Sequence, residues 1–404
     1  MLAAEAPHTL TPADTAQLSL AAALKDETAF AVAVSGGSDS MALLRMAAAL
    51  PGKRVTALTV DHGLREGSRA EAEQVARWCA AISVPHHILN WEGDKPARGI
   101  QAKARSARYD LMTAWCRSNG VPLLLTAHTL NDQAETVMMR KQRTASAASL
   151  AGIWPETEWN GVRVMRPLLS VTRCTLRATL KREGHGWLDD PSNENERFER
   201  VRIRRQLRSI DIAVLGREAE AARVQTLADR AASAEWLAHN ATVHGEGWIT
   251  FPRAALATAG SEVRVQVLAW IVAACGGGRP ERAELARLAA ALEAGSVFRR
   301  SLGGALIANR KAVVFVGREP GRIAVGPEPV PSGGLLWDGR FRIAAPEGYA
   351  VRPAWASRHP AAEGLPAIIR EGLPVLENAA GRLVFPHFDR EPGFAVQLGE
   401  RFCL

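Results

Sequence analysis

Residues 31–44 read AVAVSGGSDSMALL, and this stretch decides how the rest of the chain is interpreted. The apolar run 31–34 predicts a buried β-strand, and the residues from Met41 onward predict the start of a helix. The polar residues between them form a glycine-rich turn. Such a turn is typical of an anion-binding site, because unpaired backbone N–H groups and the helix dipole point to the same place.

The turn carries the groups that bind a nucleotide phosphate. Gly36 and Gly37 let the backbone approach closely, because no Cβ atom intervenes. Asp39 differs from the other residues of the turn because it is negatively charged. Phosphates repel a carboxylate unless a cation lies between them, so the sequence predicts Mg²⁺ held by Asp39. The predicted nucleotide-binding residues are Ser35, Gly36, Gly37, Ser38, Asp39 and Ser40, with Asp61 and His62 at the end of the following strand.

The motif differs from the two common phosphate-binding loops. A Walker A loop has Lys and then Ser or Thr after its last glycine, whereas here Ser38 follows Gly37, and the dinucleotide pattern GxGxxG does not fit. The six residues SGGSDS resemble the PP-loop of the ATP pyrophosphatase superfamily, whose members cleave ATP between the α and β phosphates and adenylate a substrate. The resemblance implies ATP as cofactor. A Ser/Gly turn that binds no ligand is the alternative.

The composition indicates a globular protein of two or three domains. The chain has 404 residues, of which 47% are hydrophobic and 23% charged, and its net charge of +8 favours a polyanionic partner. Five cysteines include no CxxC pair, so neither a disulfide framework nor a zinc ribbon is expected, and Cys79 and Cys116 fall in predicted helices as core residues. No signal-like or membrane-spanning segment is evident, which predicts a cytoplasmic protein without a membrane partner.

Strands alternate with helices after residue 30. The predicted strands cover 55–60, 85–89, 123–126 and 161–167, and the predicted helices cover 40–50, 68–81, 101–119, a stretch from about 131, and 175–183. This alternation predicts the α/β class with a doubly wound parallel sheet. Ligands of such sheets bind at the carboxyl ends of the strands, where the polar clusters 35–40, 61–62 and 128–135 lie.

Two further groups of residues are candidates for the same edge of the sheet. His128, Asp132 and Glu135 are spaced by four and three residues, so the two acids share a helix face and can hold Mg²⁺ or a substrate ammonium. Arg105 and Arg108, three apart on the preceding helix, can face the same place. The alternatives are that the acids only complement the helix dipole and that the arginines are solvated.

An arginine-rich stretch lies between residues 197 and 208. Its members are Arg197, Arg200, Arg204, Arg205 and Arg208, with Arg202 beside them. Spacings of three, four and four place Arg197, Arg200, Arg204 and Arg208 on one helical stripe, which predicts contacts with RNA phosphates; a merely solvated face is the alternative.

Composition divides the chain into five predicted parts. Residues 1–29 are expected to form an N-terminal leader with a short helix over 15–24, and residues 30–212 the ATP-binding catalytic domain. The Ala-rich residues 213–317 predict a small helical middle domain that ends in a hairpin around Asn309-Arg310. A Pro- and Gly-rich linker, 318–334, leads to a β-containing C-terminal domain, 335–404, whose aromatic residues are expected in its core.

Several blocks between residues 30 and 208 resemble, in order, those of the bacterial tRNA(Ile)-lysidine synthetases. These blocks are VDHGLR (60–65), AKARSARY (102–109), TAHTLNDQAET (126–136), RPLL (166–169) and DPSN (190–193). Two places differ from the family pattern. The loop from Arg143 lacks the usual glycines over 144–149, which is expected to stiffen it, and Asn131 stands where many members have Asp.

The resemblance implies a two-step reaction on tRNA. ATP·Mg²⁺ would adenylate the wobble cytidine (position 34) of an isoleucine tRNA with a CAU anticodon, and an amine of free L-lysine would then displace AMP to give lysidine. The roles it implies are metal binding and catalysis for Asp39, lysine or Mg²⁺ positioning for Asp132 and Glu135, and α-phosphate neutralisation for Arg105. His128, Asp132 and Arg108 would contact substrate, and the arginine stripe and later domains would hold the tRNA.

Two other functions stay open at this point. Another PP-loop tRNA-modifying enzyme is one; a thiouridine-forming member would need paired or persulfide cysteines, and the sequence has no CxxC. A non-catalytic RNA-binding protein on the same fold is the other. The sequence leaves the oligomeric state undecided, with a homodimer as one alternative.

Overall fold

The computed structural model describes residues 11–63, 67–93, 99–143, 147–189, 199–310, 312–324, 326–355 and 357–403. The chain forms two compact units, Met1–Thr226 and Leu227–Leu404, whose boundary falls inside one long helix, α9 (Ser209–Asn240). Each unit is described by itself below.

Unit 1 is built on one sheet with the strand order β3-β2-β1-β4-β6-β5. The strands are β1 (Ala29–Ala33), β2 (Arg54–Asp61), β3 (His86–Asn90), β4 (Leu123–Leu125), β5 (Glu156–Trp159) and β6 (Val162–Met165). All neighbours pair in parallel except β5, which pairs antiparallel with β6 at the edge. The predicted parallel sheet is therefore confirmed, with one antiparallel edge strand that the sequence analysis missed.

Unit 1 contains one helix before β1, and its other helices lie between or after the strands. They are α1 (Pro12–Ala23), α2 (Ser38–Ala48), α3 (Ser68–Ala81), α4 (Ile100–Ser118), α5 (Leu130–Arg143), α6 (Ala147–Leu150), α7 (Arg173–Arg182), α8 (Glu199–Gln206) and the first part of α9. The predicted helices over 40–50, 68–81 and 101–119 correspond to α2, α3 and α4. The helix predicted over 175–183 begins two residues earlier, at Arg173.

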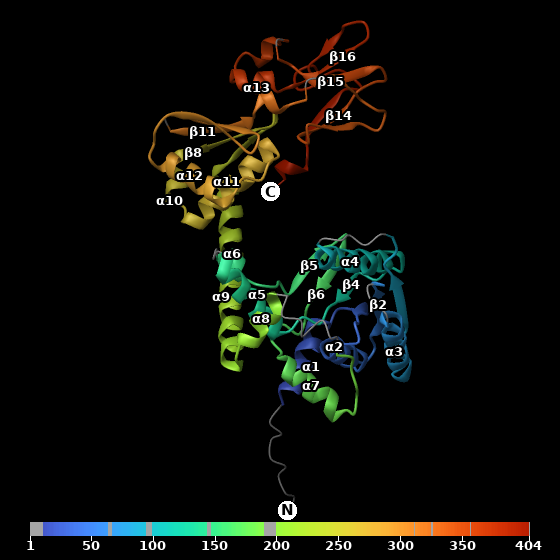
Figure 1. Cartoon of the computed structure of the whole chain (residues 1–404). Coiled ribbons are helices and arrows are strands. Elements are labelled where there is room, and N and C mark those ends of the chain that lie inside the picture. Colours follow the sequence, from blue (N-terminus) through green and yellow to red (C-terminus); the bar gives the residue numbers. More distant parts are fainter. Residues whose placement is uncertain are drawn as a thin grey trace, which may run out of the picture. The chain divides into compact units, whose positions relative to one another are not determined.

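Side chains of β1 alternate between the two faces of the sheet, and helices cover both. Phe30 and Val32 pack against α1, α2, α3 and α7, whereas Ala31 packs against α4 on the opposite face. Figure 1 shows α4 on one side of the strands and α1, α2 and α7 on the other. This arrangement confirms the doubly wound α/β fold.

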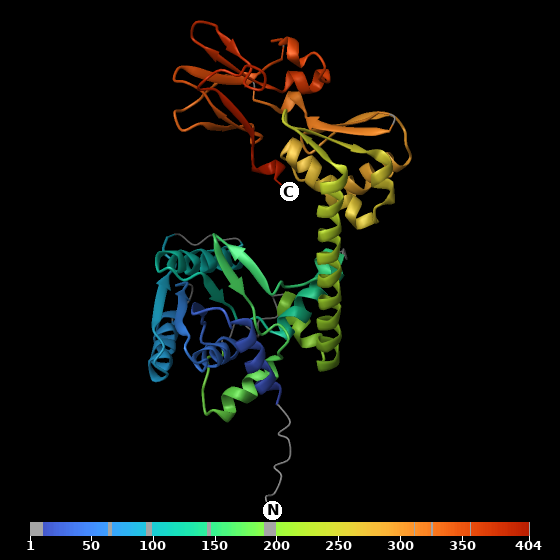
Figure 2. The same cartoon turned by 180° about the vertical axis from the view of Figure 1, so that it is seen from behind.

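Helix α1 belongs to the core of unit 1. Its residues Ala16, Leu20 and Leu24 at its end are buried in the same cluster as β1 and α2. The view from behind in Figure 2 shows α1 (blue) near α7 (light green), in agreement with their contacts. The helix predicted over 15–24 is thus present, but it does not stand apart as a leader.

Unit 2 begins with an antiparallel sheet covered on one face by helices. The sheet has the order β7-β8-β11-β10-β9. Its strands are β7 (Thr242–His244), β8 (Trp248–Pro252), β9 (Phe298–Leu302), β10 (Ala305–Arg310) and β11 (Val313–Arg318), and its helices are α10 (Arg253–Thr258), α11 (Ser261–Gly276) and α12 (Arg282–Glu293). The hairpin predicted around Asn309-Arg310 is present, but β10 continues to Arg310, so the turn lies after these residues.

The remainder of unit 2 is β-rich, with two further sheets. One sheet contains β12 (Glu328–Pro329), β15 (Tyr349–Pro353), β16 (Pro374–Asn378) and β17 (Leu383–Val384); the other contains β13 (Leu335–Trp337), β14 (Phe341–Ala344) and β18 (Ala395–Leu398); and α13 (Ala367–Glu371) precedes β16. Trp337, Phe341, Phe385 and Phe402 are buried, as predicted for the aromatic residues here, whereas Trp355 is exposed and the prediction is wrong for it.

Within unit 2, the predicted linker is anchored at both ends. Arg318 at the end of β11 donates to Asp338 (2.8 Å), and β12 pairs with β15. The residues before and after this segment belong to the same compact unit, Leu227–Leu404. The division of this unit into a middle and a C-terminal domain at 318–334 stays a prediction. No helix within the described ranges combines the length and the apolar character of a bilayer-spanning segment.

The turn after β1 needs glycine at one of its two glycine positions. Gly36 has φ +83°, and a Cβ atom added there would lie 2.7 Å from Leu188 Cδ1 and 3.1 Å from Val75. Gly37 has φ −71°, and the nearest atom to an added Cβ is Ser35 Oγ at 3.6 Å. Only Gly36 therefore combines a left-handed backbone with a crowded Cβ direction.

We predict that Gly36→Ala lowers the free energy of unfolding by about 1 to 3 kcal/mol, because it adds both backbone strain and overlap with Leu188. Gly37→Ala is the matched control and should change it by less than about 1 kcal/mol. Urea denaturation followed by circular dichroism measures both variants. Equal losses for the two variants would contradict this account of the turn.

Candidate active site

The phosphate-binding turn is held by its own hydroxyl groups. Ser40 Oγ donates to the Gly37 carbonyl (3.0 Å) and accepts from the Ser35 amide (3.2 Å). Helix α2 starts at Ser38, and its first helical hydrogen bond runs from the Met41 amide to Gly37. The amides of the first turn have no carbonyl partner inside the helix, so they are suited to receive an anion.

A cleft of about 1110 Å³ opens at the carboxyl ends of β1, β2 and β4, as expected for this fold. It brings together most of the residues predicted from sequence. Those that line it are Ser35, Gly37, Ser38, Asp39, Ser40, Asp61, His62, Arg105, Arg108, His128, Asp132, Arg200 and Arg204. The predicted residues Gly36, Glu135, Arg205 and Arg208 are not part of this lining.

Asp61 is held in place at the end of β2. One carboxylate oxygen accepts from the Gly63 amide (2.9 Å) and from Ser68 Oγ (2.8 Å) at the start of α3. Burial alone would raise the pKa of Asp61, but these two donors outweigh it and lower the pKa. Next to Asp61, the ring of His62 meets Trp91 edge-on at 5.7 Å. The cleft thus has a fixed negative charge beside the phosphate turn.

Asp132 has both carboxylate oxygens occupied. Its Oδ2 accepts from the backbone and the hydroxyl of Thr129, each at 2.8 Å, which caps the start of α5. Its Oδ1 accepts from Arg200 (2.9 Å) and Arg173 (3.3 Å). Although burial of Asp132 would raise its pKa, Arg200 and Arg173 lower it. Asp132 is therefore ionised, and in the first turn of α5 its charge also complements the helix dipole.

Glu135 lies one helical turn further along α5 and is buried, with 1% of its side chain exposed. Arg200 Nε contacts it at 2.6 Å and Arg204 Nε at 2.7 Å. Arg173 Nη1 is 3.8 Å away. A buried carboxylate requires such partners, and the arginines on α8 supply them to Glu135.

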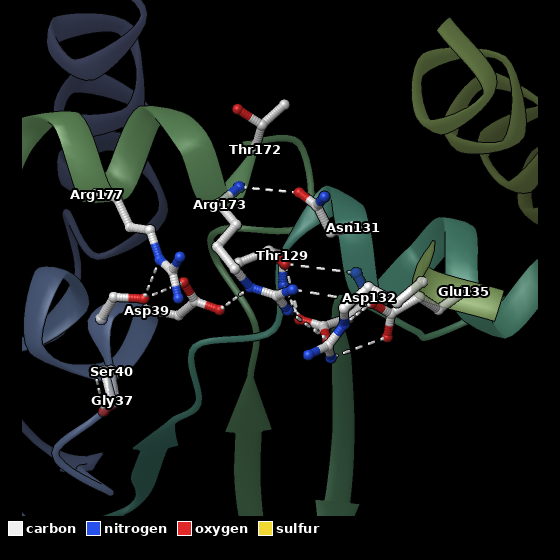
Figure 3. Close-up of polar contacts among 12 residues, drawn as sticks. Gly37, Asp39, Ser40, Thr129, Asn131, Asp132, Glu135, Thr172, Arg173 and Arg177 are labelled. Atoms are coloured by element: carbon white, nitrogen blue, oxygen red, sulfur yellow. Dashed lines mark hydrogen bonds and ion pairs between the residues drawn. The ribbon is translucent and has the colours of Figure 1, made fainter. Parts of the chain in front are cut away.

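Arg173 and Arg177 on α7 were not singled out from the sequence. Arg173 Nε donates to Asp39 Oδ2 (2.9 Å), and Arg177 Nε donates to Ser38 Oγ (3.2 Å). Figure 3 shows Arg173 between Asp39 and Asp132. The signal for this pair was an i,i+4 spacing directly after the N-cap Thr172, but the helix predicted over 175–183 began too late to include Arg173.

Asn131 fixes the position of Arg173. Its side-chain oxygen accepts from the Arg173 amide at 2.9 Å, which ties the start of α7 to the start of α5. A carboxylate oxygen of Asp would offer the same acceptor, so Asn131 keeps this interaction without adding a charge.

The arginines of the stripe do not all have the same partners. Arg200 and Arg204 contact Asp132 and Glu135, and RNA binding by these two arginines stays a prediction. Arg208 lies beyond the end of α8 and pairs with Asp211 (3.1 Å). Arg197 lies outside the described residues, and RNA binding by Arg205 and Arg208 stays a prediction.

Three other predicted segments lie wholly or partly outside the described residues. Residues 64–65 of the VDHGLR block and the DPSN block at 190–193 lie outside the described residues. Of the glycine-poor loop, 144–146 likewise lie outside, whereas α6 follows directly and is tied to α5, since Arg140 donates to the carbonyls of Ser149 (2.7 Å) and Gly152 (2.9 Å).

His128 and the α4 residues Arg105 and Arg108 form a further wall of the cleft. Burial lowers the pKa of His128 to about 3, with Arg105 contributing in the same direction while Asp132 opposes it. The ring Nδ1 lies 3.1 Å from the Thr126 hydroxyl. Arg105 and Arg108 lie 5.3 and 5.6 Å from the ring centre of Tyr109. This wall therefore offers a neutral imidazole and two cations.

The residues around Asp39 fit a Mg²⁺ ion that is shared with phosphates. Among the residues that the structure describes, no group of three or more His, Cys, Asp or Glu could hold a metal. Mg²⁺ in nucleotide sites needs only one or two carboxylates, because phosphate oxygens and water complete its shell. Asp39 meets this need: its side chain is 18% exposed in the first turn of α2.

We predict that His128 stays neutral at mildly acidic pH and weakens the fold as the pH falls. The unfolded chain binds a proton at His128 below about pH 6.5, whereas the folded protein binds it only near pH 3. Acidification from pH 7 to pH 5 therefore favours unfolding. His128→Gln should reduce the drop in Tm over this range, and the exposed residue His239 provides the control His239→Gln, which should leave it unchanged.

We also predict that two arginines of the stripe differ in their effect on stability. Arg200→Gln should cost about 1 to 2 kcal/mol of unfolding free energy, because it leaves buried Glu135 and Asp132 with fewer counterions. Arg208→Gln removes only an exposed pair and should leave the urea midpoint unchanged. A lower midpoint for the Arg208 variant than for the Arg200 variant would refute the assignment.

The chain resembles known proteins over most of its length. Residues 10–210 match the family model of the PP-loop domain. A tRNA(Ile)-lysidine synthase of Methylobacterium sp. (strain 4-46) is 39% identical over 313 residues, which cover 74% of this chain and 88% of the relative. That of Bradyrhizobium diazoefficiens is 37% identical over 345 residues, covering 77% and 92%. That of Hyphomonas neptunium is 49% identical over 192 residues, covering 45% and 51%. On this similarity, the chain belongs to the tRNA(Ile)-lysidine synthase family.

Proposed function

We propose that this protein joins L-lysine to C2 of the wobble cytidine of an isoleucine tRNA with a CAU anticodon, with ATP converted to AMP and pyrophosphate. The family supports a ligase that acts on tRNA, and the PP-loop domain supports the use of ATP. The observation that carries the proposal is one cleft lined both by the glycine-rich turn after β1 and by the acid Asp132, with the buried acid Glu135 one helical turn further along α5.

The first step is adenylation of the cytidine. The triphosphate lies against the amides that begin α2, where the helix dipole and the side chains of Ser38 and Arg177 stabilise its charge. The cytidine O2 attacks the α-phosphorus, and the bond from that phosphorus to the bridging oxygen breaks to release pyrophosphate. Mg²⁺ held by Asp39 supplies positive charge to the phosphates.

Arg105 and Arg108 are placed to stabilise the charge that develops at the α-phosphate. Both line the cleft, and they lie one helical turn apart on α4. A guanidinium group cannot lose its proton at neutral pH, so the positive charge is present throughout the reaction. The cytidine must leave its base stack to reach this position, as in other enzymes that modify a base.

The second step is attack by an amine of L-lysine on C2 of the adenylated cytidine. The new C–N bond forms as the C–O bond to AMP breaks, and AMP leaves with the former cytidine oxygen. Asp132 and Glu135 bind an ammonium group of the incoming lysine. These two acids lie one helical turn apart on α5, so both can contact the same cation. The attacking amine loses its proton to solvent or phosphate, because His128 with a pKa of about 3 is too weak a base.

The cysteines favour lysine ligation over sulfur transfer. A thiouridine-forming enzyme needs a reactive thiolate near the nucleotide, whereas Cys79 and Cys116 are buried, and burial raises the pKa of each to about 11. The two exposed cysteines, Cys174 and Cys403, are far apart in sequence and lie in different units.

The decisive assay incubates the protein with ATP, Mg²⁺, labelled L-lysine and unmodified isoleucine tRNA. We expect labelled tRNA together with AMP and pyrophosphate in equal amounts. A folded preparation that releases ADP, or that incorporates no lysine, would contradict the proposed function.

We predict that Asp39→Asn reduces kcat/KM in this assay by about 100-fold or more, because the phosphates lose the carboxylate that holds their counterion. Binding of the tRNA, measured by filter retention, should change little. Asp26→Asn is the control, since Asp26 is an exposed acid outside the cleft. Activity of the Asp39 variant within a few-fold of the parent would show that Asp39 does not hold the metal.

A further inference from the structure

Three carboxylates and three guanidinium groups meet in the cleft. The acids are Asp39 on α2 with Asp132 and Glu135 on α5; the bases are Arg173 on α7 with Arg200 and Arg204 on α8. Arg204 contacts one acid and Arg200 contacts two. Arg173 contacts all three, at 2.9, 3.3 and 3.8 Å, and only 17% of its side chain is exposed.

The formal charges of this cluster cancel, which has a consequence for a cationic substrate. An ammonium group gains most from carboxylates that lack counterions, because the gain is the Coulomb attraction that remains after desolvation. Here Asp132 Oδ1 already accepts from two arginines. In the protein without nucleotide, the acid pair is therefore a poor site for the ammonium of lysine.

Nucleotide binding changes the balance at Arg173 in particular. Arg173 Nε donates a hydrogen bond to Asp39 Oδ2, and the Asp39 carboxylate is also the group that fits the metal. A Mg²⁺ ion on this carboxylate repels the guanidinium, while the phosphates beside it carry a net negative charge and attract it. Arg173 lies in the first turn of α7 between the two groups, so a turn toward the phosphates takes it away from Asp132 and Glu135 (Figure 3).

We propose that Arg173 is a positioning residue that couples the two subsites: Mg²⁺-nucleotide draws it from Asp132 and Glu135, which then keep only Arg200 and Arg204 as counterions and bind L-lysine more tightly. This inference rests on the proposed function of the acid pair as the lysine site. It implies that nucleotide and lysine bind cooperatively, each raising the affinity for the other by the same factor.

Calorimetric titration of L-lysine into the full-length protein tests the coupling. The titration is made without nucleotide and with saturating Mg²⁺ and α,β-methylene-ATP, which cannot be cleaved at the α–β bond. We expect the lysine Kd to fall by about 5-fold or more when the nucleotide is present. In Arg173→Gln the acid pair has the same two counterions, Arg200 and Arg204, in both states, so the ratio of the two Kd values should lie below about 2.

Arg177→Gln is the matched control. Arg177 lies one turn along the same helix and contacts Ser38 and Asp189 but none of the three acids in the cluster. Its loss should weaken nucleotide binding and leave the lysine ratio at the parent value once nucleotide is saturating. Arg173→Lys keeps the charge without the bidentate reach and should give an intermediate ratio, which also covers the case that the Gln variant does not fold.

The outcomes separate this inference from the proposed function. Equal lysine affinities with and without nucleotide in the parent protein would overturn the coupling, while lysine incorporation into tRNA would still stand. Coupling that persists in both Arg173 variants would also overturn it. If lysine binds in neither state and is not incorporated, both the coupling and the proposed function fail.

Discussion

The parallel pairing of β1 between β2 and β4 is the constraint on which the site depends. Ala31 and Val32 pair with both neighbours, so three strands end at one edge of the sheet. Each strand is followed by a helix whose first turn carries polar residues: α2 after β1, α3 after β2 and α5 after β4. Residues distant in sequence, such as Asp39, Asp61 and Asp132, thereby line one cleft. The pairing register of β1 with β2 and β4 therefore decides which acids come together in the cleft.

Most of this edge was predictable, because buried parallel strands are short apolar runs and the polar residues directly follow them. The antiparallel strand β5 was missed, although Asn160-Gly161 is a common hairpin signal and both residues have positive φ. Three of its four residues, Glu156, Thr157 and Glu158, are exposed on an edge, and the strand lacks the apolar alternation that identified the other strands. Edge strands of this kind are recognised from their turns more readily than from their own composition.

The arginines were harder to assign, because helical spacing shows which residues share a face but not what that face meets. Arg200 and Arg204 were grouped correctly on one stripe, yet their partners on α5 lie more than 60 residues earlier in the chain. Arg173 was overlooked, since its importance comes from the meeting of α7 with α2 and α5. Pairings across the fold of this kind depend on tertiary structure, and local sequence carries little information about them.

Part of the positive charge of the chain is balanced inside the cleft. Arg173, Arg200 and Arg204 form ion pairs there with Asp39, Asp132 and Glu135. A carboxylate with 1% of its side chain exposed requires such partners, and the arginines of α8 supply them to Glu135. Arg173 is the member of the cluster that contacts acids on both sides, Asp39 on α2 and Asp132 and Glu135 on α5. A single side chain therefore links the glycine-rich turn to the acid pair, so a change of partner at Arg173 would be felt at both.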